Sequence, residues 1–185
     1  IGEQPGFPHG ECPSFFPLPR TTPGAGAAPA GAKTYTHVHK ASHGGKDWMQ
    51  VGTYEANGVK ENGNWTAEPE VMIDHGAMYA SKDFFDPVGN GGNGRRINWG
   101  WAKVPPASTQ TLPREVTWNP ELQQLVYSPL PEQDALRGAA IFAYGETTLS
   151  PGTVKTLYPG GDAGNQSEVE VIFEVPTTAV RIGVV

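Results

Sequence analysis

The chain has 185 residues, which is enough for one well-cored domain or for one domain with part of another. Thirteen Lys and Arg against 19 Asp and Glu give a net charge of −6, and no basic stripe is present, which argues against nucleic acid as a partner. The chain lacks any run of about 18 apolar residues, so the sequence predicts no membrane-spanning helix, and its one cysteine excludes an internal disulfide.

Helical periodicity is almost absent, and short β-branched and aromatic runs recur between turn signals, which predicts an all-β protein. Six strands are predicted, at residues 33–42, 47–55, 78–86, 95–104, 114–120 and 122–130. The stretches between them, such as "SHGGK" and "GNGGNG", are rich in residues that tolerate positive φ or fix a bend. Antiparallel hairpins are therefore expected, and "GNGGNG" is interpreted as a hairpin loop.

Three segments differ from this strand-and-turn pattern. Residues 21–32, "TTPGAGAAPAGA", predict a surface loop that no strand uses. Residues 132–138, "EQDALRG", form the one short stretch with helix-like composition, and residues 164–185 alternate apolar and polar side chains as a half-buried strand does. A domain boundary is therefore placed between residues 1–137 and residues 138–185, and the second part is too short to close a β-sandwich by itself.

Individual candidates for chemistry allow more than one interpretation. Glu11 stands next to Cys12 in "FPHGECPSFFPLPR", among proline and aromatic residues. A carboxyl group packed in such surroundings retains its proton and can act as an acid, whereas in a solvated loop it is an ordinary carboxylate. His37 and His39 alternate on one face of a predicted strand, which permits metal binding but also suits a polar sheet face, and no third ligand has suitable spacing. Sequons begin at Asn64 and Asn165.

Several short motifs occur together in one order: "GECPSFFPL" (10–18), "THVHKAS…DWMQVGTYE" (36–55), "DHGAMYASKDFFDP" (74–87), "RRINWGWAKV" (95–104), "LPREVTW" (112–118) and "SPLPEQDALRG" (128–138). With this set the chain resembles glycoside hydrolase family 32, the invertases, inulinases and fructosyltransferases, and in particular its fungal β-fructofuranosidase and fructosyltransferase group. The resemblance covers most of the chain.

The resemblance implies a five-bladed β-propeller followed by a β-sandwich, with the active site in the central funnel. In this family one carboxylate attacks the fructosyl carbon, and the glutamate of the Glu-Cys-Pro motif protonates the leaving oxygen and later deprotonates the acceptor. That glutamate is Glu11 here. Packing by Cys12, Pro13, Phe15 and Phe16, with a nearby carboxylate, would then favour its protonated form.

Two motifs of the family are missing from the sequence. Retaining chemistry needs a second carboxylate about 5 to 5.5 Å from the acid, and the family supplies it from an Asn-Asp-Pro motif that this chain lacks. The Arg-Asp-Pro motif is absent as well, and both motifs precede the acid/base in the family. The expectation is a chain that starts inside the third blade, is inert alone, and pairs with a companion chain or missing segment carrying the N-terminal blades and the nucleophilic aspartate.

The resemblance also implies further site residues and a setting. The predicted substrate-binding residues are Asp74, Tyr79, Trp99, Trp101 and His37. No cofactor and no metal are implied, the expected substrate is sucrose or a short fructooligosaccharide, and the expected location is extracellular. Hydrolysis and transfer to a sugar acceptor both remain open. The alternative is a non-catalytic carbohydrate-binding or assembly subunit that kept the propeller scaffold.

Overall fold

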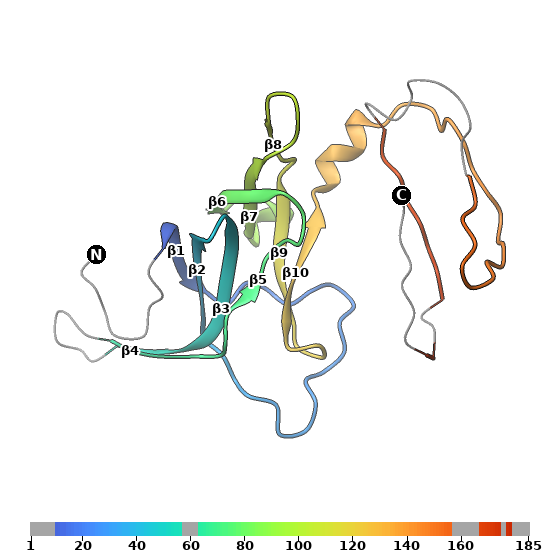
Figure 1. Cartoon of the computed structure of the whole chain (residues 1–185). Coiled ribbons are helices and arrows are strands. Elements are labelled where there is room, and N and C mark those ends of the chain that lie inside the picture. The colour runs from blue at the N-terminus through green and yellow to red at the C-terminus, as the bar shows by residue number, and fades with distance from the viewer. Residues whose placement is uncertain (1–9, 57–62, 157–166, 175–176, 179–185) are drawn as a thin grey trace. The chain divides into compact units, whose positions relative to one another are not determined.

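A computed structural model describes residues 10–56, 63–156, 167–174 and 177–178 (Figure 1). The chain divides into two compact units, Ile1–Glu132 and Gln133–Val185. Each unit is described by itself below.

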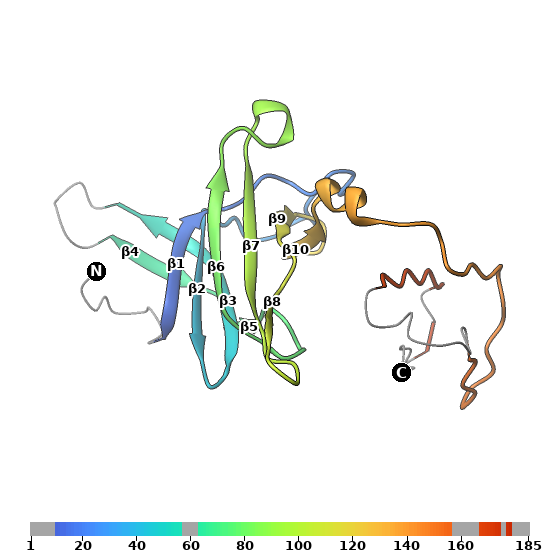
Figure 2. The same cartoon turned by 90° about the horizontal axis from the view of Figure 1, so that it is seen from above.

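The first unit contains two antiparallel sheets (Figures 1 and 2). The strands of the first sheet are β1 (Glu11–Pro17), β2 (His37–His43), β3 (Lys46–Glu55), β4 (Asn64–Ala67) and β5 (Val71–Met72). They lie in the order β1-β2-β3-β4, and β5 pairs with β3 beside β4. In this sheet β1 is an edge strand.

The strands of the second sheet are β6 (Met78–Asp86), β7 (Arg95–Ala102), β8 (Thr109–Gln110), β9 (Arg114–Asn119) and β10 (Gln124–Pro129). Their order is β10-β9-β7-β6, and β8 pairs with the end of β7. The short 3-10 helix η1 (Asn90–Gly92) lies in the β6–β7 connection, and a second one, η2 (Pro131–Leu136), follows β10. The "GNGGNG" stretch is thus the hairpin connection that its composition predicts.

All six predicted strands form, as β2, β3, β6, β7, β9 and β10, with ends shifted by a few residues. The β2–β3 turn shows why the glycine signals were informative. Gly44 and Gly45 have φ of 58° and 74°, the positive values that a two-residue hairpin turn requires. The sequence did not predict β1, β4, β5 and β8. Of these, β4, β5 and β8 span four residues or fewer, and β1 contains Pro13 and Pro17, which an edge strand tolerates.

The hydrophobic core of this unit lies between the two sheets. Phe16, Val38 and Met49 of the first sheet pack with residues of the second, namely Val116, Trp118 and Leu125. Arg96 of β7 lies over the Phe16 ring at 4.1 Å and forms a 2.9 Å ion pair with Asp83. The two sheets are therefore joined by apolar burial and by a cation–π contact at its margin.

The chain after β1 leaves the first sheet and continues alongside the second. Thr21 forms an isolated parallel bridge to Trp118, and the Thr22 amide donates a 2.7 Å hydrogen bond to the Trp118 carbonyl. Residues 21–32 thus form a loop and no strand, as predicted, and Thr21 adds one isolated bridge to β9. The backbone groups of Thr21 and Thr22 fill the edge of β9 beyond the point where β7 stops pairing.

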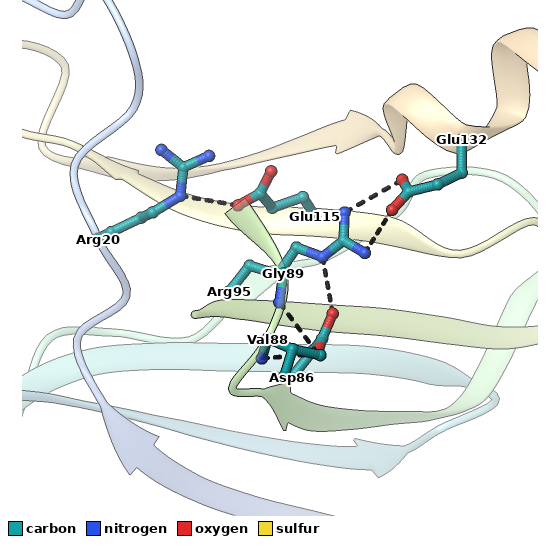
Figure 3. A network of polar contacts seen from close by, with 7 residues as sticks. All are labelled: Arg20, Asp86, Val88, Gly89, Arg95, Glu115 and Glu132. Carbon is teal, nitrogen blue, oxygen red and sulfur yellow. Dashed lines mark hydrogen bonds and ion pairs between the residues drawn. The ribbon is translucent and has the colours of Figure 1, made fainter. Parts of the chain in front are cut away.

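A polar network fixes the β6–β7 hairpin and the start of η2 (Figure 3). Arg95 donates to Asp86 at 3.0 Å and to both carboxylate oxygens of Glu132 at 2.6 and 3.1 Å. The other oxygen of Asp86 accepts from the amides of Val88 and Gly89, both at 3.2 Å. Such bidentate charge-assisted bonds hold a loop in one geometry, so this network has a structural role.

In the second unit, residues 137–156, 167–174 and 177–178 contain no strand. The half-buried strand predicted within residues 164–185 does not form over 167–174, where Ile172 is 89% and Phe173 56% exposed. An alternating sequence needs an apolar surface on which to bury one face, and these side chains have none within the described part of their unit. Glu168 in this segment accepts two hydrogen bonds from Arg137, of 2.5 and 2.6 Å. Among the described residues no helix is long and apolar enough to cross a membrane.

Candidate active site

Glu11 opens β1 at a β-bulge. It pairs with Ser42 of β2, whereas the next pair is Ser14 with Lys40, so Cys12 and Pro13 together face Ala41 alone. Cys12 has φ of 48°, a left-handed conformation that costs a non-glycine residue about 1 kcal/mol. Bulges of this kind redirect a neighbouring side chain and are common beside functional sites.

A second bulge in β6 has the same form. Tyr79 pairs with Trp101 and Lys82 with Trp99, so Ala80 and Ser81 face Gly100 alone. Ala80 has φ of 52°. In each strand the bulge follows immediately after the residue singled out in the sequence, Glu11 in β1 and Tyr79 in β6.

The two redirected side chains meet. The Tyr79 hydroxyl donates a 2.6 Å hydrogen bond to Oε2 of Glu11, which joins the two sheets. The hydrogen bond and the negative charge of Glu11 raise the pKa of Tyr79 above its ordinary value, because both oppose formation of the phenolate.

Two more residues complete this group. Lys103 Nζ lies 4.1 Å from the centre of the Tyr79 ring and 5.2 Å from that of Trp101. The Tyr79 and Trp101 rings are 6.4 Å apart and inclined at 57°. We call Glu11, Tyr79, Trp101 and Lys103 the Glu11 cluster. It offers a carboxylate, a phenol, an ammonium group and a partly exposed indole, which together suit the hydroxyls and the apolar face of a sugar.

The predicted packing around Glu11 is wrong for this chain. Glu11 is exposed, and Phe16 lies in the core between the sheets. Phe15 points to the other side of β1, where its ring stacks on His37 at 5.0 Å. Regular alternation would place residues four apart on the same face of a strand, but the bulge at Cys12 and Pro13 shifts the alternation by one residue. Phe15 therefore lies on the face opposite to Glu11.

Trp99 and Trp101 lie two residues apart and share one face of β7. Both line a shallow hollow of about 380 Å³, whose other walls come from Lys82, Ser108 and Gln110 among others. Trp99 also makes an edge contact with Phe84 at 5.3 Å and lines a second, mostly apolar hollow of about 330 Å³. Trp101 therefore belongs both to the Glu11 cluster and to this face, whereas Trp99 belongs to the face alone.

The oxygens of Asp74 are engaged by neighbouring protein groups. Its Oδ2 accepts from Arg114 at 2.9 Å, and its Oδ1 accepts from the Gly76 amide at 2.7 Å. Arg114 in turn lies over the Tyr127 ring at 5.1 Å. In this structure Asp74 connects the loop before β6 with β9.

His37 lies at the far end of the β1–β2 ladder from Glu11, since it pairs with Pro17. Its ring is in edge contact with Tyr54 at 5.3 Å, and Phe15 also contacts Tyr54 and Trp65. Burial lowers the pKa of His37, which favours the neutral ring. We call Phe15, His37, Tyr54 and Trp65 the aromatic face of the first sheet. The structure thus brings Tyr79 and Trp101 to Glu11 but places His37 elsewhere.

Sequence reasoning missed several polar residues near the bulges, namely Lys40, Asp47, Ser81 and Lys103. Lys40 could have been found from the sequence, because it lies two residues after Val38 in a predicted strand and so shares its inward-facing side. A charge at such a position needs a buried partner. Among the residues that the structure describes, no group of three His, Cys, Asp or Glu side chains could hold a metal ion.

Comparison with known proteins identifies the family. Residues 4–129 match the family model described as the glycosyl hydrolases family 32 N-terminal domain. The chain therefore belongs to glycosyl hydrolase family 32.

Two plant enzymes are among the curated relatives of the chain. The beta-fructofuranosidase, insoluble isoenzyme CWINV6, of Arabidopsis thaliana is 32% identical over 179 residues, which cover 90% of this chain and 32% of the relative. The insoluble isoenzyme 1 of Daucus carota is 30% identical over 186 residues, 92% of this chain and 30% of the relative. The chain thus spans about a third of the length of these relatives.

Solved structures agree with this assignment. The fructan 1-exohydrolase IIa of Cichorium intybus matches with a TM-score of 0.53 and 28% identity, over 70% of this chain and 26% of the enzyme. A variant of that enzyme, solved in complex with 1-kestose, matches equally well. The two antiparallel sheets therefore correspond to part of a larger family 32 structure.

Proposed function

We propose that this chain is part of a retaining β-fructofuranosidase or fructosyltransferase and supplies its acid/base, Glu11. The observation that supports this most directly is the position of Glu11. The glutamate of the family's Glu-Cys-Pro motif precedes a bulge, extends to solvent and accepts a 2.6 Å hydrogen bond from Tyr79. A side chain held in this way can approach a glycosidic oxygen, which a carboxylate engaged in an ion pair cannot do.

The proposed reaction has two steps. Glu11 protonates the leaving glucosyl oxygen of sucrose, or the corresponding oxygen of a short fructooligosaccharide, while an aspartate attacks the fructosyl carbon. Glu11 then removes the proton from the acceptor that releases fructose. Water as the acceptor gives hydrolysis, and a sugar hydroxyl gives transfer.

The nucleophile is proposed to come from polypeptide outside these residues. Two nearby carboxylates are already committed, since Asp74 pairs with Arg114 and Asp47 is 1% exposed and accepts from the Ser81 amide. Neither is placed to attack a sugar carbon. A companion chain or a missing segment that carries the N-terminal blades would supply the aspartate.

The aromatic face of the first sheet is the proposed contact for that polypeptide. Trp65 is already buried at 7% exposure, whereas Phe15 is 39% exposed, so part of this aromatic face is open to a further contact. In a five-bladed propeller the first sheet would be the third blade and the second sheet the fourth, and each face of a blade packs on a neighbour. Residues 138–185 are proposed to be the linker and first strands of the following β-sandwich.

The predicted sugar-binding residues fall into two groups, inside and outside the Glu11 cluster. Tyr79 and Trp101 belong to the Glu11 cluster and are proposed to contact the fructosyl group. Asp74, Trp99 and His37 lie outside the cluster and stay sequence-based predictions. Extracellular location and glycan attachment at Asn64, which is exposed on β4, are likewise proposals, and Asn165 lies outside the described residues.

The test uses the assembled protein, in which this chain is combined with the polypeptide that supplies the nucleophile. Glu11→Gln should lower the rate of sucrose cleavage by about 10²- to 10⁴-fold, the usual contribution of acid–base catalysis, while sugar binding is kept. Glu55→Gln makes the same chemical change at an exposed position of β3 and should leave the rate as it is. Unchanged turnover in Glu11→Gln, or no turnover in the wild-type assembly, would instead support a non-catalytic carbohydrate-binding subunit.

A further inference from the structure

Ser81, the second residue of the β6 bulge, has backbone groups that the β6–β7 ladder does not pair. Its amide donates a 2.7 Å hydrogen bond to Oδ2 of Asp47 in β3. Its carbonyl oxygen accepts from Nζ of Lys40 in β2, and its hydroxyl lies 3.1 Å from the same Nζ. Two charged side chains of the first sheet thus replace the partners that the bulge removes from the second sheet.

These three residues are almost completely excluded from solvent. Lys40 is 2%, Asp47 1% and Ser81 0% exposed. Burial lowers the pKa of Lys40 against the attraction of Asp47. Burial also acts to raise the pKa of Asp47, but the side chains of Ser42 and Ser81, the Ser81 amide and the charge of Lys40 outweigh it, and the pKa lies below the ordinary value. A buried pair of opposite charges such as Lys40 and Asp47 adds little net stability compared with apolar residues. Its effect on the position of Ser81 is therefore the more important one.

Lys40 connects the two bulges. Its backbone pairs with Ser14, the first residue after the β1 bulge, and its side chain holds Ser81 in the β6 bulge. Glu11 and Tyr79, the residues just before the two bulges, meet at 2.6 Å. A fixed distance between the bulges is therefore a condition for that contact.

We propose that Lys40, together with Asp47, is a positioning residue that holds the β6 bulge so that Tyr79 reaches Glu11. The clamp is needed because Ala80 adopts a left-handed conformation that alanine does not favour. Without the clamp β6 would relax toward a regular ladder, and a register change of one residue turns a side chain to the opposite face of a sheet. Tyr79 would then leave Glu11. The catalytic consequence rests on the proposed function, whereas the geometry does not.

The test follows the ionisation of Tyr79 in the sugar-free chain by NMR, with the tyrosines labelled at Cζ and Tyr79→Phe used for assignment. In the wild-type protein the Tyr79 midpoint should lie above 10.0, because Glu11 accepts its proton in a hydrogen bond. Lys40→Met removes the ammonium group and keeps a long unbranched side chain, and it should move the midpoint down toward 10.0. Lys33→Met makes the same change at an exposed position and should not move it.

Wild-type protein supplies a second measurement that requires no variant to fold. The Lys40 ammonium group should give its own slowly exchanging resonance with a nuclear Overhauser contact to Ser81, and the Ser81 amide should be protected from hydrogen exchange. An unchanged Tyr79 midpoint in folded Lys40→Met, or the absence of both wild-type signals, would overturn the positioning role. Since no sugar is present, these results do not depend on whether the assembled protein cleaves sucrose.

A rate measurement in the assembled protein adds the catalytic consequence. Lys40→Met should lower kcat, because Tyr79 would no longer hold the Glu11 carboxyl group, although Lys40 itself is buried and contacts Ser81 rather than the Glu11 cluster. If the Tyr79 midpoint moves without a loss of kcat, the clamp is supported, but the Tyr79–Glu11 contact is not needed for catalysis.

Discussion

The hydroxyl of Tyr79 donates a 2.6 Å hydrogen bond to Glu11, and the two residues are 68 positions apart and come from different sheets. Because the hydrogen bond and the charge of Glu11 raise the pKa of Tyr79, Glu11→Ala should lower that pKa toward 10.0. Glu11→Gln keeps a hydrogen-bond acceptor without the charge and should give an intermediate value. The NMR titration described above measures this shift, with the Tyr144 resonance as an internal reference. If the Tyr79 midpoint is the same in Glu11→Ala and wild type, the two side chains are not in contact in solution.

Arg114 should contribute more to stability than an exposed arginine does. Its guanidinium binds Asp74 at 2.9 Å and covers the Tyr127 ring, and its side chain is 23% exposed. Arg114→Leu should lower the free energy of unfolding by about 1–3 kcal/mol, because Asp74 loses its charged partner in a partly buried place. Urea denaturation followed by tryptophan fluorescence measures the change.

Arg137→Leu is the matched control for that experiment. Arg137 also binds carboxylates, but the pair is exposed, and exposed ion pairs contribute little. Equal effects of the two substitutions would show that the Asp74–Arg114 pair has no special structural role and would leave Asp74 available for sugar binding.

Stability should fall as the pH drops below about 6.5, because burial lowers the pKa of His39 in the folded chain below its ordinary value of 6.5. The unfolded chain then takes up a proton that the folded chain does not, so the free energy of unfolding decreases until the folded form is protonated as well. The slope is at most about 1.4 kcal/mol per pH unit for each proton.

His39→Gln should make this pH dependence shallower, as measured by urea denaturation between pH 7.5 and 5 in steps of about half a unit. His75→Gln removes an exposed imidazole and should keep the wild-type slope. A slope in His39→Gln as steep as that of the wild type would assign the effect to other groups, among them His37, whose pKa is also lowered by burial.

Gly52 should tolerate no side chain. A Cβ there would lie against the Thr66 carbonyl oxygen and 2.9 Å from Ala67 Cα, both on the backbone of β4. Gly52→Ala should therefore cost about 1–3 kcal/mol of stability, as overpacking does, and loosen β4. Thermal unfolding is the measurement, and Gly138→Ala, where a Cβ has open space, should leave the midpoint unchanged. Similar midpoints for the two variants would mean that β4 does not pack on β3 as described.

Regular strands of this fold could be predicted from the sequence because alternation and glycine turns are local signals. Gly44 and Gly45 mark a hairpin without reference to the rest of the chain. The edge strand β1 could not be predicted in the same way, because its two prolines oppose a strand and only pairing with β2 allows it. Likewise, the strand expected near the C-terminus depends on a partner sheet that the described part of its unit does not provide.

The site shows a similar division. Motif order identified Glu11 and Tyr79, and the structure brings them together. Neither bulge could be inferred from composition, because Cys12 and Ala80 take a conformation usually reserved for glycine. The sequence pattern places Lys40 at an inward-facing position, but its partners Asp47 and Ser81 could not be predicted, because the clamp depends on contacts between two sheets.

Leaving-group dependence in the assembled protein tests the role of Glu11 most directly. The aryloxide group of an aryl β-fructofuranoside departs without protonation, and azide attacks the fructosyl-enzyme without a general base. An enzyme that lacks its acid/base therefore keeps activity on the aryl fructoside in the presence of azide. Glu11→Ala should lose about 10²- to 10⁴-fold on sucrose and little on the aryl fructoside with azide. An equal loss on both substrates, or no loss on sucrose, would contradict acid/base catalysis by Glu11.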